Sequence, residues 1–222
     1  MVAAVIFDLD GVLVDSEPVW ERVRRAYVAE TGGRWRPDSQ ARMMGMSTGE
    51  WSAYLSDDLG VDRPPETVAR DVIERMAGEY AGGVPLLPDA TATVVRVGER
   101  WTLGLASSSP RRLVDEVLAI AGLSGEFAAV RSTEQESRGK PAPDVYLSVA
   151  REIGVEPGEC VAVEDSSNGL RAAAAAGTIV VAAPRHEYPP DPEALSLASA
   201  VVDHLGDLPT VLNELAVVGA RP

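Results

Sequence analysis

Short apolar runs alternate with helical segments through the second half of the chain, and this alternation restricts the possible folds more than any other feature. Short runs rich in β-branched residues favour strands, whereas apolar residues spaced three and four apart favour helices. Strands that are joined by helices pair in parallel, and helices cover both faces of the sheet. We therefore expect an α/β fold. The expected strands are 101–106, 127–131, 159–163 and 178–183, with a weaker one at 200–202, and the expected helices are 110–121, 143–153, 167–176 and 208–217.

Residues 2–9 form the first expected strand, and a purely helical segment follows it. Helical spacing begins at Glu17, with Ser16 as the expected N-cap. Further helical segments are expected at 48–59 and 65–80, before a glycine- and proline-containing linker at 82–85. The sequence thus predicts a larger domain made of residues 1–16 and 83–222 and a small all-helical domain made of residues 17–82.

The charge of the chain narrows the classes of partner. Acidic residues outnumber basic ones by 34 to 20, and the formal net charge is −14. Nucleic acids and anionic membranes need a basic face, so we expect neither as a partner. A small anionic substrate needs only a few well-placed cations and stays possible.

The location of the protein is inferred from cysteine content and hydropathy. Cys160 is the single cysteine, which rules out an intramolecular disulfide and favours a reducing compartment. No basic segment precedes the first apolar run, and no apolar stretch reaches ~18 residues, so neither a signal peptide nor a membrane span is expected. A cytoplasmic protein is the default expectation. A monomer is the default oligomeric state, although the sequence does not determine it.

Two pairs of acidic residues follow expected strands. Asp8 and Asp10 end the first strand, and Glu164 and Asp165 follow the strand 159–163. The carboxyl ends of parallel strands lie along one edge of a sheet, so these acids can meet there. Carboxylates held close together repel each other unless a cation lies between them, and Mg²⁺ prefers oxygen ligands. Helix caps and solvated turns use the same residue types, and the spacing alone leaves both interpretations open.

Two further segments are candidates for binding an anion. Ser107, Ser108 and Ser109 follow the strand 101–106 and precede a helix, where hydroxyls and backbone amides can contact an anion. Ser109 is equally suited to be an ordinary helix N-cap. Lys140 is followed by two prolines within three residues, which stiffen the chain around it. A solvated surface charge is the alternative for Lys140.

In this order the four segments resemble the motifs of the haloacid dehalogenase-like superfamily. Asp8-Leu9-Asp10-Gly11-Val12 is similar to the first motif and Ser107 to the second. The third corresponds to Lys140 in Gly-Lys-Pro-Ala-Pro-Asp, and the fourth to Glu164-Asp165-Ser166 with Asn168-Gly169. The resemblance covers nearly the whole chain, from about residue 2 to residue 215. It implies a Rossmann-like core with a helical cap inserted after the first motif.

The resemblance also implies a reaction. Asp8 would attack phosphorus and form an aspartyl-phosphate, and Asp10 would protonate the leaving oxygen and then activate water. Ser107 and Lys140 would hold the phosphoryl oxygens. Mg²⁺ would be bound by Asp8, by the Asp10 backbone carbonyl and by Asp165, with Glu164 as a further candidate.

Within the superfamily, the second acid of the first motif separates the branches. Asp10 argues against a dehalogenase, since that branch lacks this acid. The sequence is similar to β-phosphoglucomutases and small sugar-phosphate phosphatases. Trp20 stands where the mutases carry a histidine, and Thr48 is near the position of a cap arginine that grips a second phosphate. Both departures favour a phosphatase acting on a small phosphorylated metabolite such as a sugar phosphate. A phosphomutase is the alternative, and a non-catalytic binding protein a more distant one.

Several residues are predicted to contact the substrate. These are Glu17, Trp20, Ser108 and Asn168. Met44 and Trp51 are further candidates. Packing in the cap core is the alternative for Trp20 and Trp51. His186 and His204 lie outside the motifs and receive no role.

Overall fold

The computed structural model describes residues 2–218, and within them six strands form one parallel sheet. The strand order is β3-β2-β1-β4-β5-β6. The α/β fold expected from the alternating pattern is therefore confirmed. The strands are β1 (Ala4–Phe7), β2 (Thr102–Ser107), β3 (Ala129–Ser132), β4 (Cys160–Glu164), β5 (Ile179–Ala182) and β6 (Ala200–Val201).

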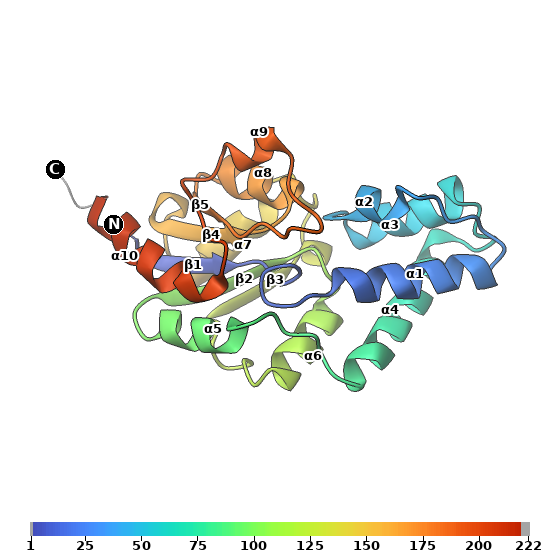
Figure 1. The fold of residues 1–222 in the computed structure, drawn as a ribbon, viewed down its shortest axis with the longest axis horizontal. Helices are drawn as coiled ribbons and strands as arrows, with labels where there is room; N and C mark the ends of the chain where they lie inside the picture. The colour runs from blue at the N-terminus through green and yellow to red at the C-terminus, as the bar shows by residue number, and fades with distance from the viewer. Residues whose placement is uncertain (1, 219–222) are drawn as a thin grey trace.

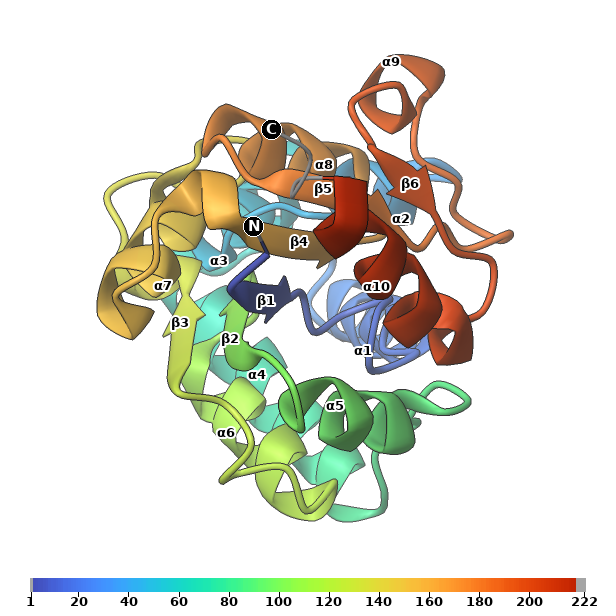
Figure 2. The same ribbon diagram turned by 90° about the vertical axis from the view of Figure 1, so that its left-hand side faces the viewer.

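Helices cover both faces of this sheet, as Figure 2 shows in a view along it. One face packs against α5 (Ala90–Gly98), α6 (Arg111–Ile120) and α10 (Leu208–Val218), and the other against α7 (Asp144–Ile153) and α8 (Ser167–Ala175). Side chains of β1 alternate between the faces: Val5 and Phe7 join the first cluster, and Ala4 and Ile6 the second. Burial on both faces explains why the strands are continuous apolar runs.

The chain forms helical elements between β1 and α5. They are α1 (Glu17–Glu30), α2 (Ser39–Met43), α3 (Thr48–Ala53) with a π-helical continuation (Tyr54–Asp58), and α4 (Pro65–Ala81). Figure 1 shows these helices gathered beyond one end of the sheet, and we call α1–α4 the cap helices. The domain limits of the cap, residues 17–82, stay a prediction. Among residues 2–218, no helix combines the length and the apolar character that a membrane span needs.

Local details differ from the sequence-based expectations. The five-residue helix α2 was not expected, because it is too short to show a helical period. The four-residue helix α9 (Pro192–Leu195) was not expected for the same reason. Ser16 does occupy the N-cap position of α1, but its side chain makes no cap hydrogen bond. Its hydroxyl instead donates to Asp10 Oδ1 at 2.5 Å.

Candidate active site

The carboxyl ends of three neighbouring strands bring the motif residues together. Asp8 directly follows β1, and its backbone N–H donates to the Val163 carbonyl of β4 at 3.0 Å. Ser107 is the last residue of β2, Glu164 is the last of β4, and Asp165 comes next. The parallel pairing of β2, β1 and β4 places all of these side chains at one edge of the sheet.

Lys140 lies at the centre of this group and is only 3% exposed. Its Nζ donates to Asp8 Oδ1 at 2.7 Å, to Glu164 Oε1 at 2.6 Å and to the Ala106 carbonyl at 3.0 Å. Burial alone would lower the pKa of Lys140, but the Asp8 and Glu164 carboxylates raise it above its ordinary value. Lys140 is therefore a fixed ammonium ion, and the alternative of a solvated surface charge is wrong.

Glu164 is fully occupied by hydrogen bonds. Its Oε1 accepts from Lys140 and from the Tyr146 hydroxyl at 2.7 Å. Its Oε2 accepts from the backbone N–H of Asp165 at 3.1 Å and from the N–H and hydroxyl of Ser166 at 3.3 and 3.2 Å. Gly169 leaves room for this carboxylate, because a Cβ there would lie 1.9 Å from Oε1. These contacts suit Glu164 to holding Lys140 rather than to binding a metal directly.

Three buried carboxylates could hold a metal ion together. Oxygen atoms of Asp8, Glu164 and Asp165 lie within 4.8 Å of one another. Burial raises the pKa values of Asp8 and Asp165, repulsion between the carboxylates raises them further, and the Lys140 ammonium opposes part of this effect. Gly11, with a φ of +78°, lets Asp165 approach the first motif, since a Cβ there would lie 1.9 Å from Asp165 Oδ2. An all-oxygen donor set of this kind fits Mg²⁺, with Asp8 and Asp165 as the available ligands.

Asp10 lies in a different environment from Asp8. Its carboxylate accepts hydrogen bonds from Ser16 at 2.5 Å and from Ser109 at 2.7 Å, and Ser107 Oγ lies 3.4 Å from Oδ2. The carboxylate of Asp10 thus belongs to a hydroxyl cluster rather than to the acidic cluster. Its predicted contribution to a metal site is through the backbone carbonyl, and that contribution stays a prediction.

One of the three serines behaves differently from the prediction. Helix α6 begins at Arg111 with Pro110 as its N-cap, so the N-cap role considered for Ser109 is wrong. Ser109 was missed as a site residue, although its place in the Ser107–Ser109 run after a strand was a usable signal. Ser107 is fully buried, and its Oγ accepts from the Ser109 N–H at 2.9 Å. The contact between Ser107 and phosphoryl oxygens stays a prediction.

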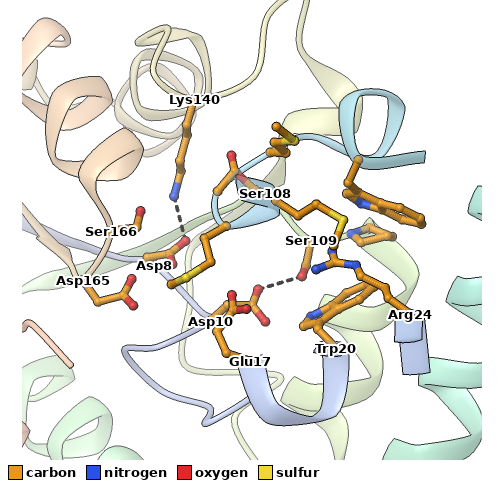
Figure 3. Close-up of a pocket in the computed structure, with 16 residues that line it drawn as sticks. Asp8, Asp10, Glu17, Trp20, Arg24, Ser108, Ser109, Lys140, Asp165 and Ser166 are labelled. Atoms are coloured by element: carbon orange, nitrogen blue, oxygen red, sulfur yellow. Dashed lines mark hydrogen bonds and ion pairs between the residues drawn. The ribbon is translucent and has the colours of Figure 1, made fainter. Parts of the chain in front are cut away.

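A cavity of about 50 Å³ lies between these residues and the cap. Asp8, Asp10, Lys140 and Asp165 line it from the strand ends, together with Ser108 and Ser109 (Figure 3). From the cap side it is lined by Glu17, Trp20, Met44 and Trp51. The cap residues predicted to face the substrate therefore do face the candidate site, although both indoles are also buried in the cap core.

The remaining predicted residues lie elsewhere. Asn168, in the first turn of α8, lies against the cap, since a Cβ on Gly45 would be 3.2 Å from Asn168 Cβ. It is not among the residues lining the cavity. His186 and His204 border a separate hollow beside Gly11 and Val12.

Arg24 also lines the cavity, although it was not predicted from the sequence. Its guanidinium lies 4.3 Å from the centre of the Trp20 ring and 5.0 Å from that of Trp51. Glu17, Trp20 and Arg24 are spaced three and four residues apart, which places them on one face of α1. That spacing was the available signal for including Arg24.

Comparison with known proteins agrees with this assembly of motifs. The family model of the haloacid dehalogenase-like hydrolases matches residues 2–177. The chain belongs to this family. As a haloacid dehalogenase-like hydrolase with relatives that are named phosphatases, it is an enzyme that acts on phosphate esters.

Two relatives and one solved structure illustrate the similarity. Hexitol phosphatase B of Escherichia coli (strain K12) is 37% identical over 197 residues, which cover 85% of this chain and 87% of that protein. A phosphorylated carbohydrates phosphatase of Thermotoga maritima is 33% identical over 177 residues, covering 78% and 81% of the two chains. The crystal structure of β-phosphoglucomutase from Clostridium difficile superposes with a TM-score of 0.85 over 100% of both chains at 22% identity, which shows the fold alone. The two sequence relatives are both named phosphatases, and the superposition adds the shared fold.

Proposed function

We propose that this enzyme is a Mg²⁺-dependent phosphatase that hydrolyses a small phosphorylated metabolite, a sugar phosphate or a close relative, through a phosphorylated Asp8. The observation that carries the proposal is the separation of two carboxylates in one loop. Asp8 is paired with Lys140 at 2.7 Å in the acidic cluster, and Asp10 is held by serine hydroxyls on the cap side. Separate environments of this kind suit one acid to nucleophilic attack and the other to proton transfer.

The residues divide the reaction into two steps. In the first, an Asp8 oxygen attacks phosphorus, the ester P–O bond breaks, and Asp10 gives a proton to the leaving oxygen. In the second, Asp10 takes a proton from water, the water oxygen bonds to phosphorus, and the bond to Asp8 breaks to release inorganic phosphate. Ser16 and Ser109 orient the Asp10 carboxyl for both transfers.

Charge is the main obstacle to the first step, because an anionic carboxylate must approach an anionic phosphoryl group. The ammonium of Lys140 lies against Asp8 and offsets part of that repulsion. Glu164 and Tyr146 keep Lys140 in place. Mg²⁺ bound by Asp8 and Asp165 would supply further positive charge beside the transferring group.

A phosphatase is favoured over a phosphomutase by the cap side of the cavity. Trp20 occupies the position where the mutases carry a histidine, and it is packed against Trp51 with ring centres 5.9 Å apart. The names of the sequence relatives, a hexitol phosphatase and a phosphatase of phosphorylated carbohydrates, also support hydrolysis. The alternative of a non-catalytic binding protein has no support, since every motif residue is present and assembled. Cytoplasmic location and a monomeric state stay predictions.

The test is phosphate release from a panel of hexitol and hexose phosphates with Mg²⁺, using wild type and Asp8→Asn. We expect release by wild type, loss on chelation of Mg²⁺ and a fall of at least about a thousandfold in Asp8→Asn, because the nucleophile is removed. Asp115→Asn, an equivalent change on the exposed face of α6, is the control and should retain activity. Glucose 6-phosphate accumulating from β-glucose 1-phosphate and a trace of bisphosphate, without free phosphate, would contradict the phosphatase assignment.

A further inference from the structure

Arg24 is a buried cation whose hydrogen bonds are incomplete. The residue is 5% exposed, and its Nε has no hydrogen-bond partner among the described residues. The guanidinium contacts both the Trp20 and the Trp51 rings, which offset part of the cost of burying its charge. Figure 3 shows it pointing from α1 into the space between the cap and Ser109. Buried donors without partners are rare and costly, so a partner from outside the chain is expected.

Gln40 shows the same incompleteness from a second cap helix. It is 5% exposed; its Nε2 donates to Glu17 Oε2, and its Oε1 has no partner among residues 2–218. Glu17 lines the cavity next to Arg24, and burial raises its pKa to about 7 even though Arg24 lowers it. One wall of the cavity therefore combines a free donor, a carboxylate and, behind it, a free amide oxygen.

The combination of a hydrogen-bond donor and a carboxylate on one cavity wall determines which ligand groups can bind there. A hydroxyl both donates and accepts hydrogen bonds, so it can satisfy Arg24 and Glu17 together, whereas a phosphate dianion only accepts. Above the Glu17 pKa of about 7, a second phosphate would also meet an ionised carboxylate at close range, and like charges in a buried site are strongly disfavoured. The two indole faces supply apolar surface for the C–H groups of a carbon chain.

We propose that Arg24 and Glu17, the latter held in place by Gln40, form a subsite that binds the neutral hydroxyl-bearing part of the substrate and disfavours a second phosphate. The inference rests on the proposed phosphatase function, because it assigns the ester phosphate to the Asp8–Lys140 side of the same cavity. It makes the substrate class a phosphomonoester of a polyol or sugar rather than a bisphosphate. A purely structural role in the cap core is the competing explanation, and it predicts equal effects of the variants on all substrates.

The experiment compares kcat/KM for three probes: glucitol 6-phosphate, fructose 1,6-bisphosphate and 4-nitrophenyl phosphate, the last of which has no hydroxyls beyond its phosphate. The variants are Arg24→Met and the nearly isosteric Glu17→Gln. We expect each to lose at least about tenfold on glucitol 6-phosphate and less than about threefold on 4-nitrophenyl phosphate. Glu17→Gln should also reduce the preference of wild type for glucitol 6-phosphate over the bisphosphate.

Arg22→Met is the matched control, because Arg22 lies on the same helix but forms an exposed pair with Glu79 at 2.6 Å. It should leave all three rates unchanged. Equal losses on all probes in both variants, or no loss on glucitol 6-phosphate, would overturn the subsite. Calorimetry measures the subsite without turnover: the affinity of Asp8→Asn for glucitol 6-phosphate should fall by at least about tenfold when Arg24→Met is added. Wild type that releases phosphate from none of the probes would contradict the proposed function instead.

Discussion

Lys140 is one positive charge among three buried carboxylates, and this imbalance dominates the chemistry of the site. If Asp8, Glu164 and Asp165 were all ionised, Lys140 would leave two negative charges uncompensated, which is the charge that one Mg²⁺ ion balances. The raised pKa values of Asp8 and Asp165 reflect the same excess of negative charge, together with burial. Both carboxylate oxygens of Glu164 accept hydrogen bonds from the protein. Asp8 and Asp165 are therefore the acids with oxygens free to bind a metal ion.

Glu17 should make the stability of the fold depend on pH. Its pKa is raised from 4.5 to about 7, chiefly by burial, so the folded protein holds this proton more tightly than the unfolded chain. The stabilising contribution is complete below pH 4.5 and is lost as the pH rises through about 7. We therefore expect Glu17→Gln, which cannot ionise, to gain up to about 3 kcal/mol relative to wild type between pH ~5 and pH ~8.

Urea unfolding of both proteins at the two pH values measures this change. Glu126→Gln removes a charge from an exposed loop and serves as the control. A difference between wild type and Glu17→Gln that stayed constant with pH would show that Glu17 is ionised at both values.

The hydrogen-bond partners of the serine hydroxyls could not be predicted from the sequence. Ser16 and Ser109 each precede a helix, and a hydroxyl there commonly caps the helix. In the structure both hydroxyls turn to Asp10. Capping rules use only the local sequence, whereas the choice of partner here depends on an acid up to 99 positions away along the chain. Asp8 and Asp165 were predictable because each closely follows an apolar strand.

At the scale of elements, the start of α8 fixes the position of Glu164. Gly169 lies in the first turn of α8, and a Cβ there would lie within 2.0 Å of all three carboxylate atoms of Glu164. Helix formation alone would favour alanine at this position, by roughly 1 kcal/mol. The glycine is therefore required by the close approach of β4 and α8, not by the conformation of the helix.

Gly169→Ala should displace Glu164 and with it Lys140. We expect kcat to fall by at least about tenfold and the free energy of unfolding to fall by about 1–3 kcal/mol, because a buried hydrogen-bonded carboxylate must move. Gly78→Ala is the matched control: Gly78 is exposed in the interior of α4, and nothing lies within 4 Å of the added Cβ. That change should stabilise by about 0.5–1 kcal/mol and leave kcat unchanged. Equal kcat values in the two variants would refute the role assigned to Gly169.

Element prediction from the sequence succeeded where apolar runs were continuous. Strands β2 and β4 are buried on both faces, so their positions were visible in the sequence to within one or two residues. Helix α2 was not visible, because five residues carry less than two turns of pattern. The α2 residue Gln40 was missed for the same reason, although it contacts Glu17 across 23 positions of the chain.

At the scale of the whole molecule, the sheet domain and the cap both contribute residues to the candidate site. The strand ends supply the acids and Lys140, whereas the cap supplies Glu17, Trp20 and Arg24. The sequence could predict both parts, but not how they meet, since that depends on side-chain contacts between distant segments. Thr48 contacts Glu134 at 3.2 Å, and Glu74 contacts Arg112 at 2.8 Å, both at the surface. Exposed contacts of this kind contribute little to holding the cap against the strand ends.

Substrate entry should require the cap to move away from the strand ends, because cap residues and strand-end residues line the same cavity from opposite sides. Ser47 of the cap and Gly139, next to Lys140, offer a way to block this movement. A Cβ on Gly139 would lie 3.1 Å from Ser47 Cβ. A disulfide needs a Cβ–Cβ separation of about 3.8 Å, so a shift of a few tenths of an ångström would accommodate one.

We expect oxidised Ser47→Cys/Gly139→Cys to lose at least about 90% of its phosphatase activity and to recover it on reduction, because the cross-link keeps the cavity closed. The single variants under the same oxidant are the controls, and they should stay active because the native Cys160 is buried and has a pKa raised to about 11 by burial. Mass measurement under non-reducing conditions confirms the bond. Full activity of the cross-linked enzyme would mean that substrate reaches Asp8 without movement of the cap at this point.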